Sequence, residues 1–363
     1  MNAAKGPVAI VAIVRLALSA SLLLLAFLAG CGGDTSDRAA ADSSTAAEVA
    51  SASVAQPFRF FSPISFWNKH LADTAPLDPT SARAISRFEA EIEAEKRLGT
   101  PPTINTRRWS VPIYRVPANQ PDVRVEHAGA GTSPSLQQAW SAVPLPPNAH
   151  PAAGSDRHLV VWQPSSDKLW EFWHLRHDSS GWHARWGGAM EHVSTNPGVY
   201  GPEAWPGATS HWGATASSLA LAGGLITLED FAAGKIEHAL AIGIPDVRAD
   251  EYSAPARRTD GTSTDPLSLP EGAHLRLNPE LNLAALHLSP TALMIARATQ
   301  HYGIFVRSLG SHVVFFGQDP TPTGTGPYMG ADGFFEGTEP SQLLEGFPWG
   351  HLQLLKLNLH REQ

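Results

Sequence analysis

The sequence is short of cysteine, because Cys31 is the only one among 363 residues. A single cysteine can form neither an internal disulfide nor a thiolate metal cluster. Charged residues make up only 17% of the chain, and Lys and Arg form no block. Because a basic patch is the usual mark of a protein that binds nucleic acid, we expect no nucleic-acid partner.

Motifs of several common enzyme classes are also missing. The chain has no GxSxG nucleophile elbow, no P-loop and no GxGxxG fingerprint. We therefore expect no cofactor. We expect no metal either, because no HxxxH pair has a supporting acid. A zinc site is the alternative, with candidate ligands His158, His174, His183 and His238.

Glycine and proline, by contrast, are abundant, with 31 and 30 residues. Such a composition suits a chain of many strands and turns better than a helical protein. The hydrophobic content of 43% is enough to build a core. We expect a mainly β protein, with a single jelly-roll-like β-sandwich domain decorated by a few short helices.

The N-terminus has the pattern of a secretory signal. Lys5 and Arg15 supply positive charge, and the apolar run 16–28 is too short to span a bilayer with ease. The run ends in Leu28-Ala29-Gly30-Cys31, which resembles the lipobox of bacterial lipoproteins. This resemblance implies cleavage before Cys31 and acylation of its sulfur. The alternative is an ordinary secretory signal followed by an accidental cysteine.

The chain divides into three parts on this interpretation. Residues 1–30 are the signal peptide, and residues 31–56 are a disordered tether with little apolar surface to bury. Aromatic residues begin at Phe58, and 57–363 is expected to be a single β-rich domain. We expect an extracytoplasmic protein that a lipid anchor holds at a cell membrane.

Residues 154–188 hold five of the eleven tryptophans and should form the centre of the fold. Alternating β-formers separated by two polar turns predict a three-strand meander. Because side chains alternate along a strand, Trp170 and Phe172 should share one face. Glu171 and Trp173 should share the other.

Four polar residues of this stretch are the candidate catalytic groups: Asp156, Arg157, His158 and Glu171. Paired carboxylates divide acid and base roles when their environments separate their pKa values, as glycoside hydrolysis requires. A histidine beside an arginine instead suits removal of the proton α to a uronate carboxylate, which is lyase chemistry. The structural alternative pairs Asp156 with Arg157 and gives Glu171 a backbone or arginine partner.

Candidate substrate-binding residues are indoles, histidines and an arginine: Trp173, Trp186, His211, Trp212, His238 and Arg257. Indoles in a wet groove stack on sugars, whereas indoles in a core simply fill it. The glycine-rich stretch 196–224 should be a long functional loop. The alternative for His238 is a core histidine with a satisfied hydrogen bond. Arg257 and Arg258 either clamp an anion or belong to a solvated loop.

Other elements have clear local signals. A helix should begin near Asp78 and Pro79, and a Thr227–Asp230 capping box should open a short one. Ser289-Pro290 should start another helix. Two strands around Leu309-Gly310 should form a hairpin.

The stretch from about 154 to 320 resembles a family of secreted bacterial proteins of uncharacterised function. The segments that carry this resemblance include GSDRHLVVW (154–162), LWEFW (169–173), GWHARWGGAMEHVSTN (181–196) and ATQHYGIFVRSLGSHVVFFG (298–317). Matching segments cover about half of the chain in the same order. The resemblance implies no particular reaction and no catalytic residue.

The expected function follows from tryptophan content and envelope location. We expect a membrane-tethered protein that acts on or binds polysaccharide, as a hydrolase or a lyase. The alternative is a non-catalytic binding or scaffolding lipoprotein of the cell envelope.

Overall fold

The computed structural model describes residues 59–130, 133–324 and 326–362. The predicted signal peptide, Cys31 and the tether lie outside these residues. The chain from Gln56 to Gln363 clusters as one compact unit. In the described ranges, no helix has both the length and the apolar character needed to cross a membrane.

Strands dominate the described chain, which confirms the mainly β prediction, and the helices are few. The strands form four sheets of six, five, three and three strands, a more divided arrangement than one sandwich. The two small sheets have the orders β11-β10-β17 and β3-β7-β6. Their strands are β3 (Val125–His127), β6 (Arg176–Asp178), β7 (Gly181–Ala184), β10 (Val247–Ser253), β11 (Leu269–Glu271) and β17 (Leu359–Arg361).

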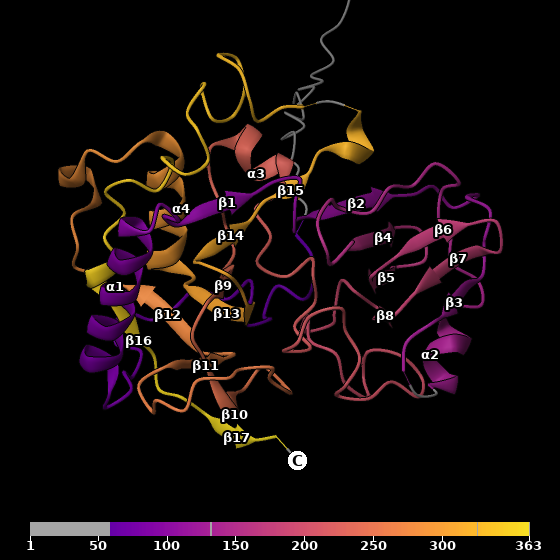
Figure 1. The fold of residues 1–363 in the computed structure, drawn as a ribbon, viewed down its shortest axis with the longest axis horizontal. Coiled ribbons are helices and arrows are strands. Elements are labelled where there is room, and N and C mark those ends of the chain that lie inside the picture. The colour runs from indigo at the N-terminus through magenta and orange to yellow at the C-terminus, as the bar shows by residue number, and fades with distance from the viewer. Residues whose placement is uncertain (1–58, 131–132, 325, 363) are drawn as a thin grey trace, which may run out of the picture. The chain divides into compact units, whose positions relative to one another are not determined.

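The six-stranded sheet has the order β1-β14-β9-β13-β12-β16 and mixes parallel with antiparallel pairs. Helices α1 (Ser81–Arg97) and α4 (Pro290–His301) lie beside it (Figure 1). The apolar stripe of α1 joins the hydrophobic cluster of this sheet, because Ile85, Phe88 and Ile92 are buried there. The strands are β1 (Thr103–Asn105), β9 (Leu240–Ile244), β12 (His274–Leu277), β13 (Ile304–Leu309), β14 (Val314–Phe316) and β16 (Leu352–Leu354).

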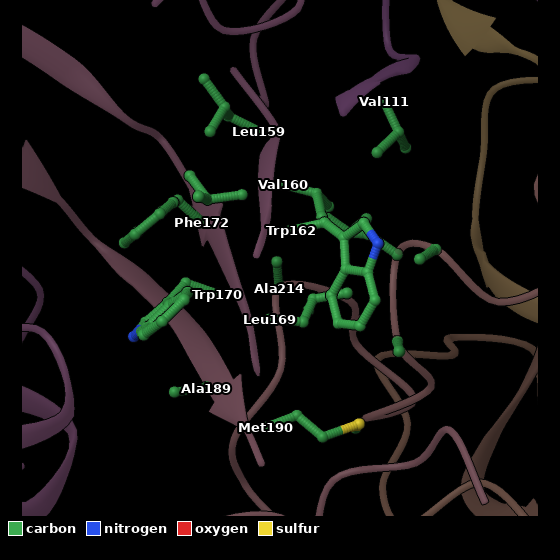
Figure 2. Packing of buried hydrophobic residues seen from close by; sticks show 14 of the residues in the cluster. Val111, Leu159, Val160, Trp162, Leu169, Trp170, Phe172, Ala189, Met190 and Ala214 are labelled. Carbon is green, nitrogen blue, oxygen red and sulfur yellow. The ribbon is translucent and has the colours of Figure 1, made fainter. Parts of the chain in front are cut away.

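The five-stranded sheet has the order β15-β2-β4-β5-β8, and its hydrophobic cluster also takes in Phe305, Val314 and Phe316 of the six-stranded sheet. Trp170 and Phe172 of β5 lie on one side of the strand (Figure 2), as the alternation predicts. Both are buried, and Phe172 packs on Trp140. The strands are β2 (Val111–Arg115), β4 (Leu159–Gln163), β5 (Lys168–Trp173), β8 (Trp186–Met190) and β15 (Gln318–Asp319).

The predicted three-strand meander is only partly right. Strands β4 and β5 pair antiparallel, but the chain then leaves this sheet to form the β6–β7 hairpin before β8 returns to pair with β5. All three residues of β6 are exposed. A strand with no buried side chain cannot serve as an inner strand of a sheet that covers a core, so the detour has a simple physical reason.

The predicted hairpin around Leu309-Gly310 is wrong. Strand β9 lies between β13 and β14, parallel to the first and antiparallel to the second. Every residue of β9 is buried, so this strand takes the inner position. The chain from 310 to 313 therefore crosses the end of β9 instead of making a tight turn.

Local helix signals are closer to the structure. Thr227 and Asp230 form the expected capping box of α3 (Leu228–Ala233), and Ser289 caps α4. Helix α1 begins at Ser81, because Asp78 accepts hydrogen bonds from Thr80 in a preceding turn. The remaining helical segments are α2 (Pro134–Ala139) and the 3₁₀ turns Leu283–Leu286, Thr321–Thr323 and Trp349–His351.

Candidate functional site

A cavity of about 680 Å³ lies between the two large sheets. The five-stranded sheet contributes His158, Trp173 and Trp186, which stand just before β4, at the end of β5 and at the start of β8. The six-stranded sheet contributes Arg307 of β13 and Phe316 of β14. His158, Trp173 and Trp186 come from three separate chain segments. The antiparallel pairing of β4 with β5 and of β5 with β8 brings these segments to one end of the five-stranded sheet.

One wall of the cavity is aromatic. Trp173 and Trp186 are directly opposite partners in the β5–β8 pairing, so their indoles lie at the same sheet edge. The indole of Trp186 donates a 2.7 Å hydrogen bond to the His211 carbonyl. Trp109 also lines the cavity and is 40% exposed. Exposed indoles whose N–H groups already have partners present flat apolar faces to a ligand.

Asp156 and His158 both line the cavity. Ser155 connects Asp156 to the aromatic wall, because its hydroxyl lies 3.2 Å from the carboxylate and accepts the Trp109 indole N–H at 3.0 Å. Burial lowers the pKa of His158 to about 4, with the nearby Arg307 charge adding to the effect and Asp156 opposing it. His158 is therefore a neutral imidazole at pH 7.

Asp260 is the second carboxylate of the cavity. Burial raises its pKa, the charge of Asp156 raises it further, and a hydrogen bond to the Leu309 backbone opposes the rise. Glu271 lies behind Asp260, fully buried, and accepts the Asp260 backbone N–H at 3.2 Å. Burial and the Asp260 charge raise the pKa of Glu271 well above its usual range. The two cavity carboxylates thus have different environments.

Two arginines form the cationic side of the cavity. Arg307 is 1% exposed, and burial lowers its pKa to about 9. Its guanidinium lies 3.9 Å from the centre of the Phe316 ring. Arg258 donates hydrogen bonds to the carbonyls of Gly213 and Thr215, so it holds the glycine-rich loop against the cavity.

Glu171, predicted as catalytic, lies outside the cavity lining and is fully buried. Its two oxygens accept the backbone N–H groups of Ala214 and Leu221 at 2.7 and 2.8 Å. Burial raises its pKa to about 7, while these hydrogen bonds, Arg307 and the Tyr200 hydroxyl lower it. This geometry matches the structural alternative, because the Glu171 side chain supports the loop that forms the cavity wall.

Some of the residues predicted to bind substrate line the cavity and others do not. Trp173 and Trp186 line it. Trp212 is 1% exposed and belongs to the hydrophobic core, so the prediction that it binds substrate is wrong. His238 is a satisfied structural histidine, hydrogen-bonded to Asp230 and to the Ala239 carbonyl. Three further predicted residues are exposed and lie outside the cavity lining: Arg157, His211 and Arg257.

The sequence does not single out Asp260, and it names Arg258 only as a neighbour of Arg257. Arg307 is missed although it carries a readable signal, a lone charge in the apolar run Ile304-Phe305-Val306. A buried arginine in a strand normally has a polar or charged partner, so such a residue indicates a functional site. Asp260 has no comparable signal, because it lies in a polar loop like many solvated ones.

Of the four histidines considered for zinc, only His158 lines the cavity. His183 lies next to Ser180 and Asp178 on the β6–β7 hairpin, whereas His158 lies at the cavity. Within the residues that the structure describes, no group of three His, Cys, Asp or Glu side chains is arranged to hold a metal ion.

Comparisons with family models, with curated proteins and with solved structures returned no match for the chain. The resemblance to secreted bacterial proteins stays a prediction from sequence segments. The chemistry of the cavity between the two large sheets is therefore the basis for any functional conclusion.

Proposed function

We propose that this chain is a membrane-tethered, extracytoplasmic glycoside hydrolase that binds a polysaccharide segment in the cavity between the two large sheets. The observation that carries the proposal is a pair of carboxylates, Asp156 and Asp260, in one cavity with three tryptophans. Carboxylates in pairs perform glycoside hydrolysis, and indoles stack on sugar rings.

The two carboxylates have complementary roles in this proposal. Asp260 donates a proton to the glycosidic oxygen in this proposal, and burial and the charge of Asp156 raise its pKa, which is the direction that favours a general acid. Asp156 accepts the proton of the water that adds to the anomeric carbon. The bond to the leaving sugar breaks as that sugar receives the proton of Asp260, so atoms and charges balance.

The aromatic wall supplies the binding surface. Trp173 and Trp186 are neighbours across two strands, and Trp109 is joined through Ser155 to Asp156. A sugar that stacks on Trp109 is thereby brought close to the Asp156 carboxylate. The flat faces of three indoles favour a chain of sugar rings over a compact polar ligand.

A β-elimination of a polyuronate is the second candidate, and it is favoured by Arg307 and His158. These two side chains line the same cavity, and the charge of Arg307 acts on the imidazole. In this reaction His158 removes the proton α to the uronate carboxylate while Arg307 neutralises that carboxylate. The glycosidic C–O bond β to that carboxylate then breaks, the departing sugar oxygen receives the proton from His158, and the product carries a carbon–carbon double bond that hydrolysis never forms.

The extracytoplasmic location belongs to the same proposal. It is supported by the apolar run that ends in Leu28-Ala29-Gly30-Cys31. An anchored protein outside the cytoplasm meets polysaccharide of the envelope or of the surroundings.

A panel of neutral and acidic polysaccharides tests the function. New reducing ends without absorbance of unsaturated uronates indicate hydrolysis, and both signals together indicate elimination. Binding without either signal indicates the non-catalytic lipoprotein. We expect Asp260→Asn to lower the rate of hydrolysis by about 10²-fold or more with an unchanged melting temperature.

Asp122→Asn is the matched control for this experiment, because Asp122 is exposed and lies outside the cavity lining. The control should hydrolyse at the wild-type rate. An Asp260→Asn protein that is folded and equally fast would exclude Asp260 as the acid.

A further inference from the structure

The guanidinium of Arg307 has one edge in use and one edge free. Its Nη1 group donates to the carbonyls of Leu221 and Gly223 at 2.9 and 3.1 Å. Its Nε is buried and has no hydrogen-bond partner among the described residues. The Nη2 group likewise has no partner in residues 59–362 where they are described. The edge formed by Nε and Nη2 is a planar fork that matches the two oxygens of a carboxylate.

The surroundings of Arg307 leave its positive charge uncompensated. Both acceptors of its hydrogen bonds are backbone carbonyls, and the Phe316 ring covers one face of the guanidinium. Glu171, whose charge acts on Arg307, directs its two oxygens to the amides of Ala214 and Leu221. A buried charge without a direct counter-ion is costly, and such groups are normally paired.

We propose that the free edge of Arg307 binds a carboxylate of the ligand, so that the cavity is specific for polysaccharides that contain uronic acid. This inference rests on the proposed glycan-binding function of the same cavity. The residue lies on β13, across the cavity from the indoles of β5 and β8. A uronate ring stacked on an indole of the five-stranded sheet can therefore present its carboxylate to Arg307 of the six-stranded sheet.

The carboxylates of the cavity are compatible with an anionic ligand. Asp156 and Asp260 share the cavity with two arginines, Arg258 and Arg307, and His158 is neutral at pH 7. A ligand carboxylate on Arg307 then replaces the missing counter-ion of a buried cation.

The test compares each acidic polymer with its own neutral form on the wild-type protein. Polygalacturonate and polyglucuronate, and the carboxyl-reduced form of each, are titrated into the full-length protein in detergent, and affinity is measured by calorimetry. We expect one polyuronate to bind at least about tenfold more tightly than its reduced form, because a charge-assisted bidentate pair is lost on reduction. If each of the two polyuronates binds with the same affinity as its reduced form, the inference is overturned and the glycan function still stands.

The variant Arg307→Lys adds a second measurement. Lysine keeps the charge and loses the planar fork, so the ratio of the affinities for the polyuronate and for its reduced form should fall about tenfold. Arg297→Lys is the control, because Arg297 is exposed on α4. If Arg307→Lys does not fold, the wild-type comparison decides alone. Absence of binding to every acidic and neutral polymer overturns the proposed function, and the inference with it.

Discussion

Glu171 supports the cavity without lining it. Each carboxylate oxygen accepts one backbone N–H of the glycine-rich loop, at Ala214 and at Leu221. Ala214 and Leu221 themselves line the cavity. A single side chain on β5 therefore determines how close this loop lies to the five-stranded sheet.

The substitution Glu171→Gln tests this role. A glutamine amide offers one acceptor where the loop presents two donors, so one buried N–H loses its partner. We expect the free energy of unfolding to fall by about 1–3 kcal/mol in chemical denaturation. Glycan hydrolysis per folded molecule should stay within a few fold of wild type. A stable variant with no activity would instead assign Glu171 a direct role in the reaction.

His158 should make the protein sensitive to acid. Its pKa in the folded state is lowered to about 4 by burial, and an exposed histidine titrates near about 6.5. The unfolded chain therefore binds this proton first as pH falls. The contribution of neutral His158 to the free energy of unfolding is fully present above about pH 6.5. It is lost toward pH 4, at up to about 1.4 kcal/mol per pH unit.

Denaturation of His158→Gln between pH 4 and pH 7 measures this effect. We expect a shallower loss of stability on acidification than in the wild type. His274 also has its pKa lowered to about 4 by burial, so part of the pH dependence should remain. The control is His192→Gln, since His192 is exposed. Identical pH profiles for wild type and His158→Gln would contradict the prediction.

Among the larger elements, the loop of residues 196–224 depends on glycine at a particular point. Gly213 has a φ of +108°, and a Cβ there would lie 2.8 Å from the Tyr200 ring. The Tyr200 hydroxyl lowers the pKa of Glu171, and the charge of Glu171 raises that of Tyr200. Gly213 lines the cavity, so this backbone conformation forms part of the wall.

We expect Gly213→Ala to destabilise the protein by about 1–3 kcal/mol, because the alanine is strained and pushes against a packed ring. Ligand affinity should fall as well. Gly181→Ala is a matched control, with a φ of +113° and no atom within 4 Å of its added Cβ. The control carries the backbone strain without the contact. Equal losses in the two variants would show that contact with Tyr200 contributes nothing.

Features encoded by neighbouring residues could be predicted from the sequence. The capping box at Thr227 and Asp230 and the alternation along β5 depend only on short-range geometry. The separation of β13 from β14 by β9 depends on pairing across long stretches of chain. Asp260 and Arg307 could not be joined to Asp156 for the same reason, because only the sheet arrangement brings them to one cavity.

Considered as a whole molecule, the chain joins a described β-rich unit to a predicted membrane anchor. The residues that carry the anchor signal are 1–31, and they precede the described part. The proposed polysaccharide substrate is large and fixed in the surroundings of the cell. An anchored enzyme would act on the polymer close to the membrane.

Acylation of Cys31 can be measured directly. We expect Cys31→Ser to abolish labelling by a fatty-acid analogue, because this is the only cysteine in the chain. The soluble variant should keep its glycan affinity, since the cavity is formed by residues from 105 onward. Equal labelling of wild type and variant would exclude the lipobox interpretation.

The construction of the cavity from two different sheets has an evolutionary consequence. Trp173 and Trp186 belong to the five-stranded sheet, while Arg307 and Phe316 belong to the six-stranded sheet. Substitutions that alter the indoles change the sugar faces that are accepted and leave the carboxylate-binding arginine in place. If the cavity binds uronates as proposed, substitutions at the indoles would alter the sugars recognised while the preference for acidic polymers stays.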